Sequence, residues 1–240
     1  MRAARAQTRK MHSAEELIVG TDLPSAPAFI DILAAEAAQP SLRKGERTRR
    51  RTLWATADEL TRTPFAQLSM DAIARAADVS RAALYQYVGS KEEAVRTVLT
   101  AFHARTLAMP LDRTRGRTPL ESIARTNRWY IDYFQKNAIF MERVRELHAL
   151  MPELVAEKQK VNRVWGERVI ASVARHGTLD LTPIQIRLRT LALECMIDDV
   201  LRELFVIANP DVREVGSDLD LLANELAAIW HAGLYGGNGH

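Results

Sequence analysis

Residues 69–93 read SMDAIARAADVSRAALYQYVGSKEE, and this stretch decides the fold. Ser69 is a residue type that caps helices, and it precedes apolar side chains at i, i+3, i+4 and i+7 spacing. These side chains are Met70, Ile73, Ala74 and Ala77. Asp78 then favours a tight turn, because Asp tolerates a left-handed backbone better than most residues other than Gly. The pattern predicts a short helix that ends in a turn.

A second short helix follows the turn. Ser80 is its predicted cap, and only Leu84 and Val88 need to face a core. The side chains left free to meet another molecule are Arg81, Ala82, Ala83, Tyr85, Gln86 and Tyr87. Two small helices joined by a short turn form a helix-turn-helix. Arginine pairs with guanine in the major groove and small side chains approach thymine methyls, so this outer surface favours DNA.

The flanking segments complete a three-helix unit. A helix is predicted from about Arg47 to Thr61, with its apolar side facing inward. Ser90 and Glu93 form a capping-box pattern that opens a long helix running toward Met109. We therefore place a helix-turn-helix domain in residues 41–94.

The charge of the chain is concentrated in this same unit. Residues 41–91 carry 10 basic and 5 acidic side chains, net +5, whereas the segments on either side are each net −1. A local excess of positive charge favours a polyanionic partner.

Residues 46–94 resemble the DNA-binding domain of the TetR family of transcriptional repressors. The shared features are the Ser/Thr cap, Ile-Ala, Ala-x-Val-Ser, Leu-Tyr, the aromatic pair and Ser-Lys-Glu. Three positions depart from the family pattern: Asp78 and Ala82 stand where Gly is common, and Val88 replaces Phe. These departures leave the fold prediction unchanged, but they weaken any inference about the operator sequence.

The resemblance implies a set of DNA contacts. Phosphate contacts are expected from Ser69, the Met70 backbone, Ser80, Tyr85, Tyr87 and Lys91. Base contacts are expected from Arg81, with Ala82 and Ala83 at the groove floor, and backbone contacts from Arg47 and Arg50. Two alternatives stay open: the tyrosines pack against the first helix, and the basic run is a solvated face.

The rest of the chain also predicts helices, so the fold is all-α. Cap patterns stand at Thr118-Pro119, Met151-Pro152, Thr182-Pro183 and Ser217, and breaks stand at Pro110, Gly177 and Asn209-Pro210. Residues 95–240 are expected to form a helical ligand-binding and dimerisation domain. Residues 1–40 are an N-terminal extension, with a tail over 1–20 and a possible short helix bearing Phe29 and Leu33.

No catalytic or metal site is predicted. The single cysteine excludes a disulfide framework, and no Glu-x-x-His pair exists for a di-iron site. Asp198-Asp199 resembles half of an acidic magnesium cluster, but we expect Arg202 to neutralise Asp198 at i+4. No cofactor is predicted, and the protein is not expected to be an enzyme.

Aromatic side chains at helical spacing predict either a core or a cavity in residues 95–240. The candidate pocket residues are Asn127, Trp129, Tyr130, Phe134, Trp165, Val169, Glu194 and Ile197. The second half of the chain is also similar to the ethionamide-resistance type of repressor, which implies pocket positions at Tyr130, Phe134 and Trp165. A roomy cavity would favour an effector over a solid core.

The last two long helices carry more apolar surface than one domain needs. Paired across a two-fold axis they would form a four-helix dimer interface. Its candidate residues are Leu188, Leu191, Cys195, Leu222, Leu226, Ile229 and Trp230. The alternative is that these side chains are buried within one chain.

The function predicted from the sequence is a cytoplasmic, homodimeric DNA-binding regulator, a repressor. Its expected partners are a double-stranded, pseudo-palindromic operator and a small apolar effector that releases it, with no membrane partner. The alternatives are a helical enzyme and an architectural DNA binder without an effector.

Overall fold

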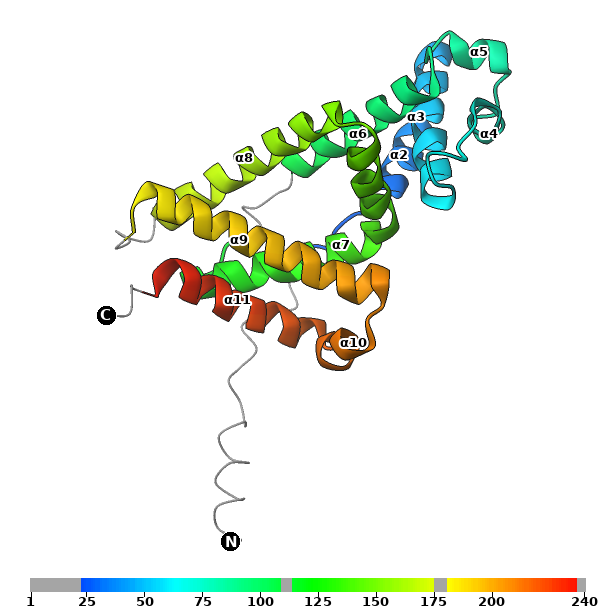
Figure 1. Ribbon diagram of the computed structural model, residues 1–240. Helices are drawn as coiled ribbons and strands as arrows, with labels where there is room; N and C mark the ends of the chain where they lie inside the picture. The colour runs from blue at the N-terminus through cyan, green and yellow to red at the C-terminus, as the bar shows by residue number, and fades with distance from the viewer. Residues whose placement is uncertain (1–22, 109–113, 175–180, 237–240) are drawn as a thin grey trace, which may run out of the picture.

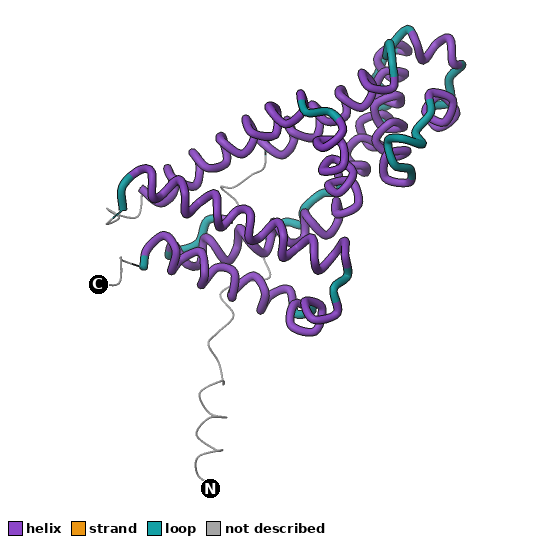
Figure 2. The backbone as a smooth tube through the Cα atoms, in the orientation of Figure 1, coloured by secondary structure: helices purple, strands orange, loops and turns teal. Residues whose placement is uncertain are grey.

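The computed structural model describes residues 23–108, 114–174 and 181–236, and within these ranges it contains helices and no strand (Figures 1 and 2). The elements are α2 (Phe29–Ala37), α3 (Lys44–Arg62), α4 (Met70–Ala76), α5 (Arg81–Tyr85), α6 (Lys91–Leu107), α7 (Pro119–Leu150), α8 (Glu153–Ala174), α9 (Pro183–Arg202), a π-helical turn (Glu203–Ile207), α10 (Pro210–Gly216) and α11 (Leu219–Tyr235). None of the described helices has the length and apolar character needed to cross a membrane. The predicted tail over 1–20 and the predicted breaks at Pro110 and Gly177 lie outside the described residues.

The helices form a small N-terminal unit joined to a larger helical body. Helices α3, α4 and α5 lie together at one end of the molecule, and α6 leads from them into the body built from α7 to α11 (Figure 1). Helix α6 is continuous from Lys91 to Leu107. It therefore belongs to both parts and connects them rigidly.

Most helix starts lie where the cap residues predicted them. The hydroxyls of Ser69, Ser80, Ser90 and Thr118 each accept a hydrogen bond from the backbone N–H three residues later. At Thr182 the full capping box forms, because Gln185 also accepts from the Thr182 backbone N–H.

Two predicted boundaries were wrong. The last helix is capped by Asp218 and not by Ser217, since the Asp218 carboxylate accepts from two backbone N–H groups. Helix α9 ends at Arg202 and not at Asn209, because the chain continues as a π-helical turn to Ile207. Ala208 then takes a left-handed φ of 60°, which ends the turn.

The N-terminal extension contains the expected short helix, and it is docked between the two parts. Phe29 and Leu33 are each 1% exposed. The Phe29 ring packs against Phe102 of α6 and Phe140 of α7, with ring centroids 5.2 and 4.9 Å away. Helix α2 also packs along α3. A single hydrophobic core consequently runs from the helix-turn-helix through α2 and α6 to α7 and α8.

Candidate nucleic-acid interface and interior cavity

The helix-turn-helix is formed by α4, a tight turn and α5. Ser69 and Ser80 cap the two helices with 3.1 Å hydrogen bonds. Between them Asp78 adopts a φ of 52°, the left-handed conformation expected from the sequence. Leu84 is fully buried, so α5 is fixed to the unit by one side and presents the other to solvent.

Arg81 is the most available of the predicted base-contacting residues. Its side chain is 61% exposed and its guanidinium lies 3.3 Å from the Asp71 carboxylate. The guanidinium also lies 5.8 Å from the centre of the Tyr85 ring, which is itself exposed. Both contacts are on the surface, where an ion pair contributes little, so Arg81 can exchange them for a base edge.

The other exposed candidates on this surface are Ser69, Ser80 and Ala82, while Ala83 and Tyr87 are half-buried. The Met70 side chain is buried, which leaves only its backbone for a phosphate. The Tyr87 hydroxyl lies beside Gly45 at the start of α3. Tyr85 therefore does not pack against α3 as a core residue would, whereas Tyr87 partly does.

Three predicted phosphate-contacting cations are held in contacts within the chain. Arg47 donates to the carbonyls of Pro40 and Leu42, at 3.2 and 3.0 Å. Arg50 pairs with Glu46 one turn earlier, at 2.9 Å. These contacts order the start of α3, so the two arginines do not simply form a solvated face.

Lys91 is the third such cation. Its ammonium donates to the Phe65 carbonyl at 3.0 Å and lies 4.3 Å from the centre of the Phe65 ring. An ammonium has three donors, so this contact leaves capacity for a phosphate.

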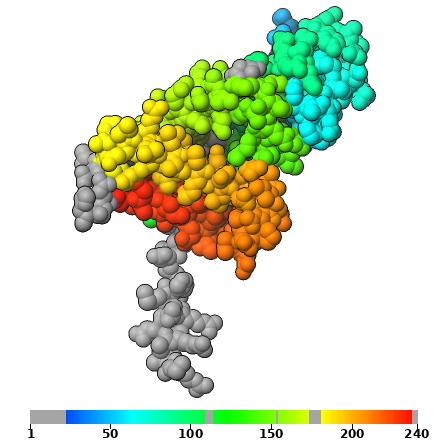
Figure 3. All heavy atoms as spheres, viewed as in Figure 1, coloured from blue at the N-terminus to red at the C-terminus, as the bar shows by residue number. Residues whose placement is uncertain are grey.

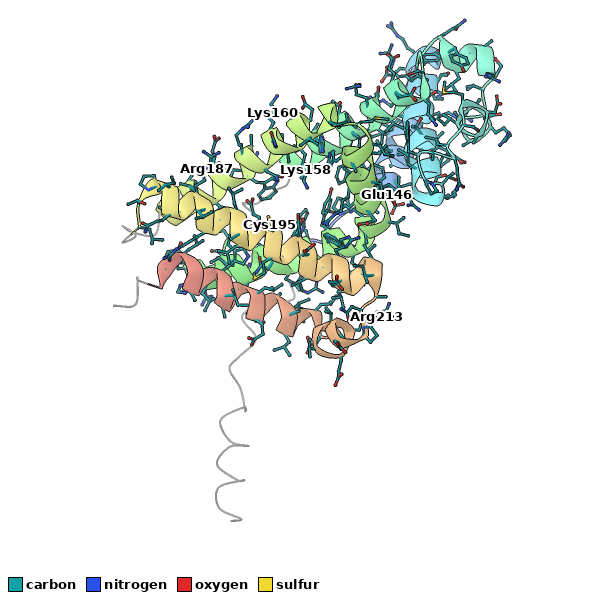
Figure 4. All side chains as sticks on the ribbon, in the orientation of Figure 1. Glu146, Lys158, Lys160, Arg187, Cys195 and Arg213 are labelled. Atoms are coloured by element: carbon teal, nitrogen blue, oxygen red, sulfur yellow. The ribbon has the colours of Figure 1, made fainter. Side chains whose placement is uncertain are left out.

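A cavity of about 700 Å³ lies in the helical body between α6, α7, α8, α9 and α11. All eight pocket residues chosen from the sequence line it: Asn127, Trp129, Tyr130, Phe134, Trp165, Val169, Glu194 and Ile197. The surface is hollowed between α8 and α9 (Figure 3). Lys158 lies on the side of α8 that faces α9 and lines the cavity, whereas Lys160 lies on the opposite side (Figure 4).

Three buried nitrogen atoms in the cavity wall have no hydrogen-bond partner. They are Asn127 Nδ2, His148 Nε2 and Trp230 Nε1. Asn127 and Trp230 are only 5% and 7% exposed. Buried polar atoms are nearly always satisfied, so unpartnered ones on a cavity wall indicate positions for polar atoms of a ligand or water.

Two acidic side chains of α9 face this cavity one helical turn apart. Tyr130 of α7 donates to Asp198 Oδ1 at 2.6 Å. Burial raises the pKa of Asp198, and the hydrogen bond from Tyr130 opposes that rise. Burial, with the charge of Asp198, raises the pKa of Glu194 to about 7.

A histidine pair lines the cavity beside the helix that leads to the DNA-binding unit. His103 of α6 stacks on His148 of α7, with ring centroids 6.3 Å apart. Burial lowers the pKa of both rings, that of His148 to about 4. Both side chains are therefore neutral near pH 7 and form a packed contact between α6 and the cavity wall.

The predicted ion pair between Arg202 and Asp198 was wrong. Arg202 binds Glu142 of α7 with both arms of its guanidinium, at 2.9 and 2.8 Å, because α9 packs closely on α7. Asp199 pairs instead with Arg145. Among the described residues, no three His, Cys, Asp or Glu side chains are grouped as metal ligands.

The predicted dimer residues divide between two sides of α9 and α11. Leu188, Leu191 and Ile229 are 67%, 40% and 48% exposed. Leu226 and Trp230 are buried within the chain itself, at 4% and 7% exposure. Cys195 is exposed and Leu222 is half-buried. For Leu226 and Trp230 the structure supports burial within one chain, because α11 packs on α7 and α9.

The sequence analysis did not identify several residues of the DNA-facing surface and of the cavity wall. Asp71 pairs with Arg81, and His103, Arg145 and Lys158 line the cavity. Each comes from a helix or a turn position whose orientation depends on tertiary packing. The cavity is also lined by three residues that the sequence assigned to a dimer interface: Leu191, Cys195 and Trp230.

Residues 53–97 match the family model of the tetR family of bacterial regulatory proteins. The match covers the second half of α3, all of α4 and α5, the turn between them and the start of α6. No curated protein matches the chain.

Several solved structures share the fold of this chain over about four fifths of its length. A TetR-like transcriptional regulator from Rhodococcus sp. RHA1 is 20% identical with a TM-score of 0.55, over 80% of this chain and 97% of its own. The fatty acid degradation regulator FadR from Bacillus halodurans is 17% identical with a TM-score of 0.59, over 78% and 96%. The TetR family regulator PfmR from Thermus thermophilus is 19% identical with a TM-score of 0.55, over 79% and 100%.

The family match and the shared fold identify the N-terminal unit as a TetR-type helix-turn-helix domain on an all-α chain. Outside residues 53–97 the likeness to these regulators is one of fold.

Proposed function

We propose that this protein is a DNA-binding transcriptional regulator of TetR type, a repressor that binds a pseudo-palindromic operator as a homodimer. It leaves the operator when a largely apolar effector enters the cavity. The observation that carries the proposal is the continuity of α6. Its N-terminal turn directly follows the helix-turn-helix, and Phe102 and His103 near its other end line the cavity.

The coupling follows from this geometry. A ligand shifts a conformational equilibrium only by its different affinity for the two states. A ligand that displaces His103 or Phe102 moves α6, and with it the helix-turn-helix at the other end. In a dimer this changes the distance between the two α5 helices, which must match half-sites about one helical turn or more apart.

The proposed dimer uses the exposed apolar rows of α9 and α11. Ile184 and Leu188 follow one side of α9, and Ile229 lies on the exposed side of α11, which runs beside α9 (Figure 1). Exposed apolar rows of this kind on neighbouring helices favour a two-fold four-helix interface. The proposed location is the cytoplasm, where the operator would be.

The decisive experiment combines operator selection with an effector screen. The purified protein is used to select its operator from random DNA, and a library of apolar compounds is screened for a rise in melting temperature. A compound that stabilises the protein should release the operator in proportion, with a coupling of about 1–3 kcal/mol.

Trp165→Ala provides the control for the cavity. Trp165 is half-buried and lines it, so this variant should change effector affinity while operator affinity stays nearly the same. Stabilising compounds without DNA release would instead support an architectural DNA binder, and turnover of a compound would support a helical enzyme.

A further inference from the structure

Glu194 is an acidic residue of the cavity wall whose carboxylate has no ion-pair partner among the described residues. Its side chain is half-buried. Leaving a carboxylate unpaired in a partly desolvated site is costly, so such a group is a candidate for ligand contact.

We propose that the cavity selects an effector with a protonated amine on an apolar body, and that Glu194, supported by Asp198, binds the amine. This inference rests on the proposed function only in that the bound ligand controls DNA binding. Binding of the amine to the cavity can be tested without DNA.

The surrounding charges leave Glu194 in a negative field. From α9, the charge of Asp198 raises the pKa of Glu194 further. From α7, Arg145 is engaged with Glu142 and Asp199. The guanidinium of Arg168 on α8 lies 5.8 Å from the centre of the Trp165 ring.

The remaining basic groups that line the cavity come from α6, α7, α8 and the segment before α7. Lys158 of α8 lowers the pKa of His148 and of Asp198. His103 and His148 are neutral near pH 7, because burial lowers their pKa values. The remaining charged group, Arg115, precedes α7. A positive ligand group would therefore meet Glu194 without an internal competitor.

The walls beside Glu194 suit the rest of such a ligand. Tyr130, Phe134 and Trp129 offer ring faces and edges, which attract cations as well as apolar groups. Independently of the acidic pair, the unpartnered Asn127 Nδ2 and Trp230 Nε1 are more than nine-tenths buried and line the same cavity. They can donate to an acceptor oxygen, so we expect the effector to carry a carbonyl group as well as the amine.

A matched series of probes tests the charge of the head group. N-(2-Aminoethyl)decanamide, N-(2-hydroxyethyl)decanamide and N-decanoylglycine share the chain and the amide, and differ in being cationic, neutral and anionic. With the full-length protein at pH 7, calorimetry should give the amine at least about a tenfold lower Kd than the alcohol, because one partly buried ion pair is added. The glycine conjugate should bind weakest.

Glu194→Gln should abolish the preference for the amine and leave binding of the alcohol nearly unchanged. Glu214→Gln is the matched control, since Glu214 is exposed on α10 and does not line the cavity. It should retain the full preference.

The release of protons provides a second readout. Because the pKa of Glu194 is about 7, a bound cation should expel about half a proton at pH 7. Titrations in phosphate and in Tris reveal this as different binding enthalpies. Equal or tighter binding of the alcohol or the glycine conjugate overturns the proposal, and so does proton uptake on binding the amine.

The outcomes separate this inference from the proposed function. If the amine is preferred but does not release operator DNA, the site stands and the regulatory role fails. If the alcohol or the glycine conjugate releases DNA as well as the amine does, the regulatory role stands and the selection for amines fails.

Discussion

The Tyr130 hydroxyl donates to Asp198 Oδ1 across 2.6 Å, and this bond joins α7 to α9 in the wall of the cavity. Burial raises the pKa of Tyr130 well above its usual value, so the phenol keeps its proton at any physiological pH. The bond also stabilises the ionised form of Asp198, whose pKa burial alone would raise further.

Tyr130→Phe should destabilise the protein by about 1–3 kcal/mol at pH 8, because a buried carboxylate loses its donor. The pKa of Asp198 should rise further in the variant. A raised carboxyl pKa costs stability only where the group is ionised, so the deficit relative to the unchanged protein should grow between pH 4 and pH 8. Urea unfolding at several pH values measures it. Tyr85→Phe, at an exposed tyrosine, should show no such trend.

Glu194→Gln should make the free protein more stable at pH 8 and not at pH 4. The pKa of Glu194 is about 7 in the folded chain, against an ordinary 4.5. Between these values the unfolded chain binds fewer protons, so stability falls as pH rises through this window. The gain is at most about 3 kcal/mol, at 1.36 kcal/mol per pKa unit. A constant difference between the two proteins from pH 4 to pH 8 would contradict the assignment.

Arg81→Ala should relax specificity at one base pair of each half-site, with a loss of about 1–3 kcal/mol against the preferred base. Affinity for random DNA should change much less. Competition binding with single-base operator variants measures both. Arg213→Ala is the control, because Arg213 lies on α10, far from α5 (Figures 1 and 4).

Lys91→Ala should weaken binding to operator and random DNA alike and lower the salt slope by about one. It should also reduce folding stability by about 1 kcal/mol, since the Phe65 carbonyl loses its donor. The two effects are separated by measuring the salt dependence of DNA binding and the urea midpoint on the same preparation. A loss confined to the specific operator would mean that Lys91 contacts a base.

Leu188→Glu should give a folded monomer with little operator affinity, because this side chain is 67% exposed in the single chain. The same change at Leu226 should unfold the protein, since it places a charge at a site that is 4% exposed. Sedimentation with circular dichroism distinguishes the two results. Val215→Glu, on α10 and 73% exposed, should leave a dimer. A Leu188→Glu dimer would refute the proposed interface.

Local chemistry was sufficient to predict most helix starts. Ser80 and Thr182 cap helices because a side-chain oxygen within three residues satisfies a free N–H group, and this depends on nothing distant. Asp78 likewise adopts the left-handed turn that its residue type tolerates. The π-helical turn before Ala208 has no comparable local signal, so it was missed.

Orientation between helices could not be predicted in the same way. The apolar pattern marks Leu226 and Leu188 equally as hydrophobic, and only the packing of α11 on α7 decides which is covered. Arg202 illustrates the same limit: Asp198 lies at i−4 in sequence, but Glu142 on a neighbouring helix offers two oxygens at once. The cavity residues were predicted as a set because aromatic side chains are grouped in the sequence, whereas their hydrogen bonds follow from the fold.

The docking of the N-terminal extension has a consequence for synthesis on the ribosome. The Ala26 N–H donates to Asp132 and the Phe29 N–H donates to Asn137, each bond closing a gap of more than 100 residues. Helix α3, the other surface that α2 covers, is translated immediately after α2, but α7 leaves the exit tunnel much later. At about 5–20 residues per second this interval lasts several seconds. During that time the N-terminal extension of the nascent chain lacks its hydrogen bonds to α7.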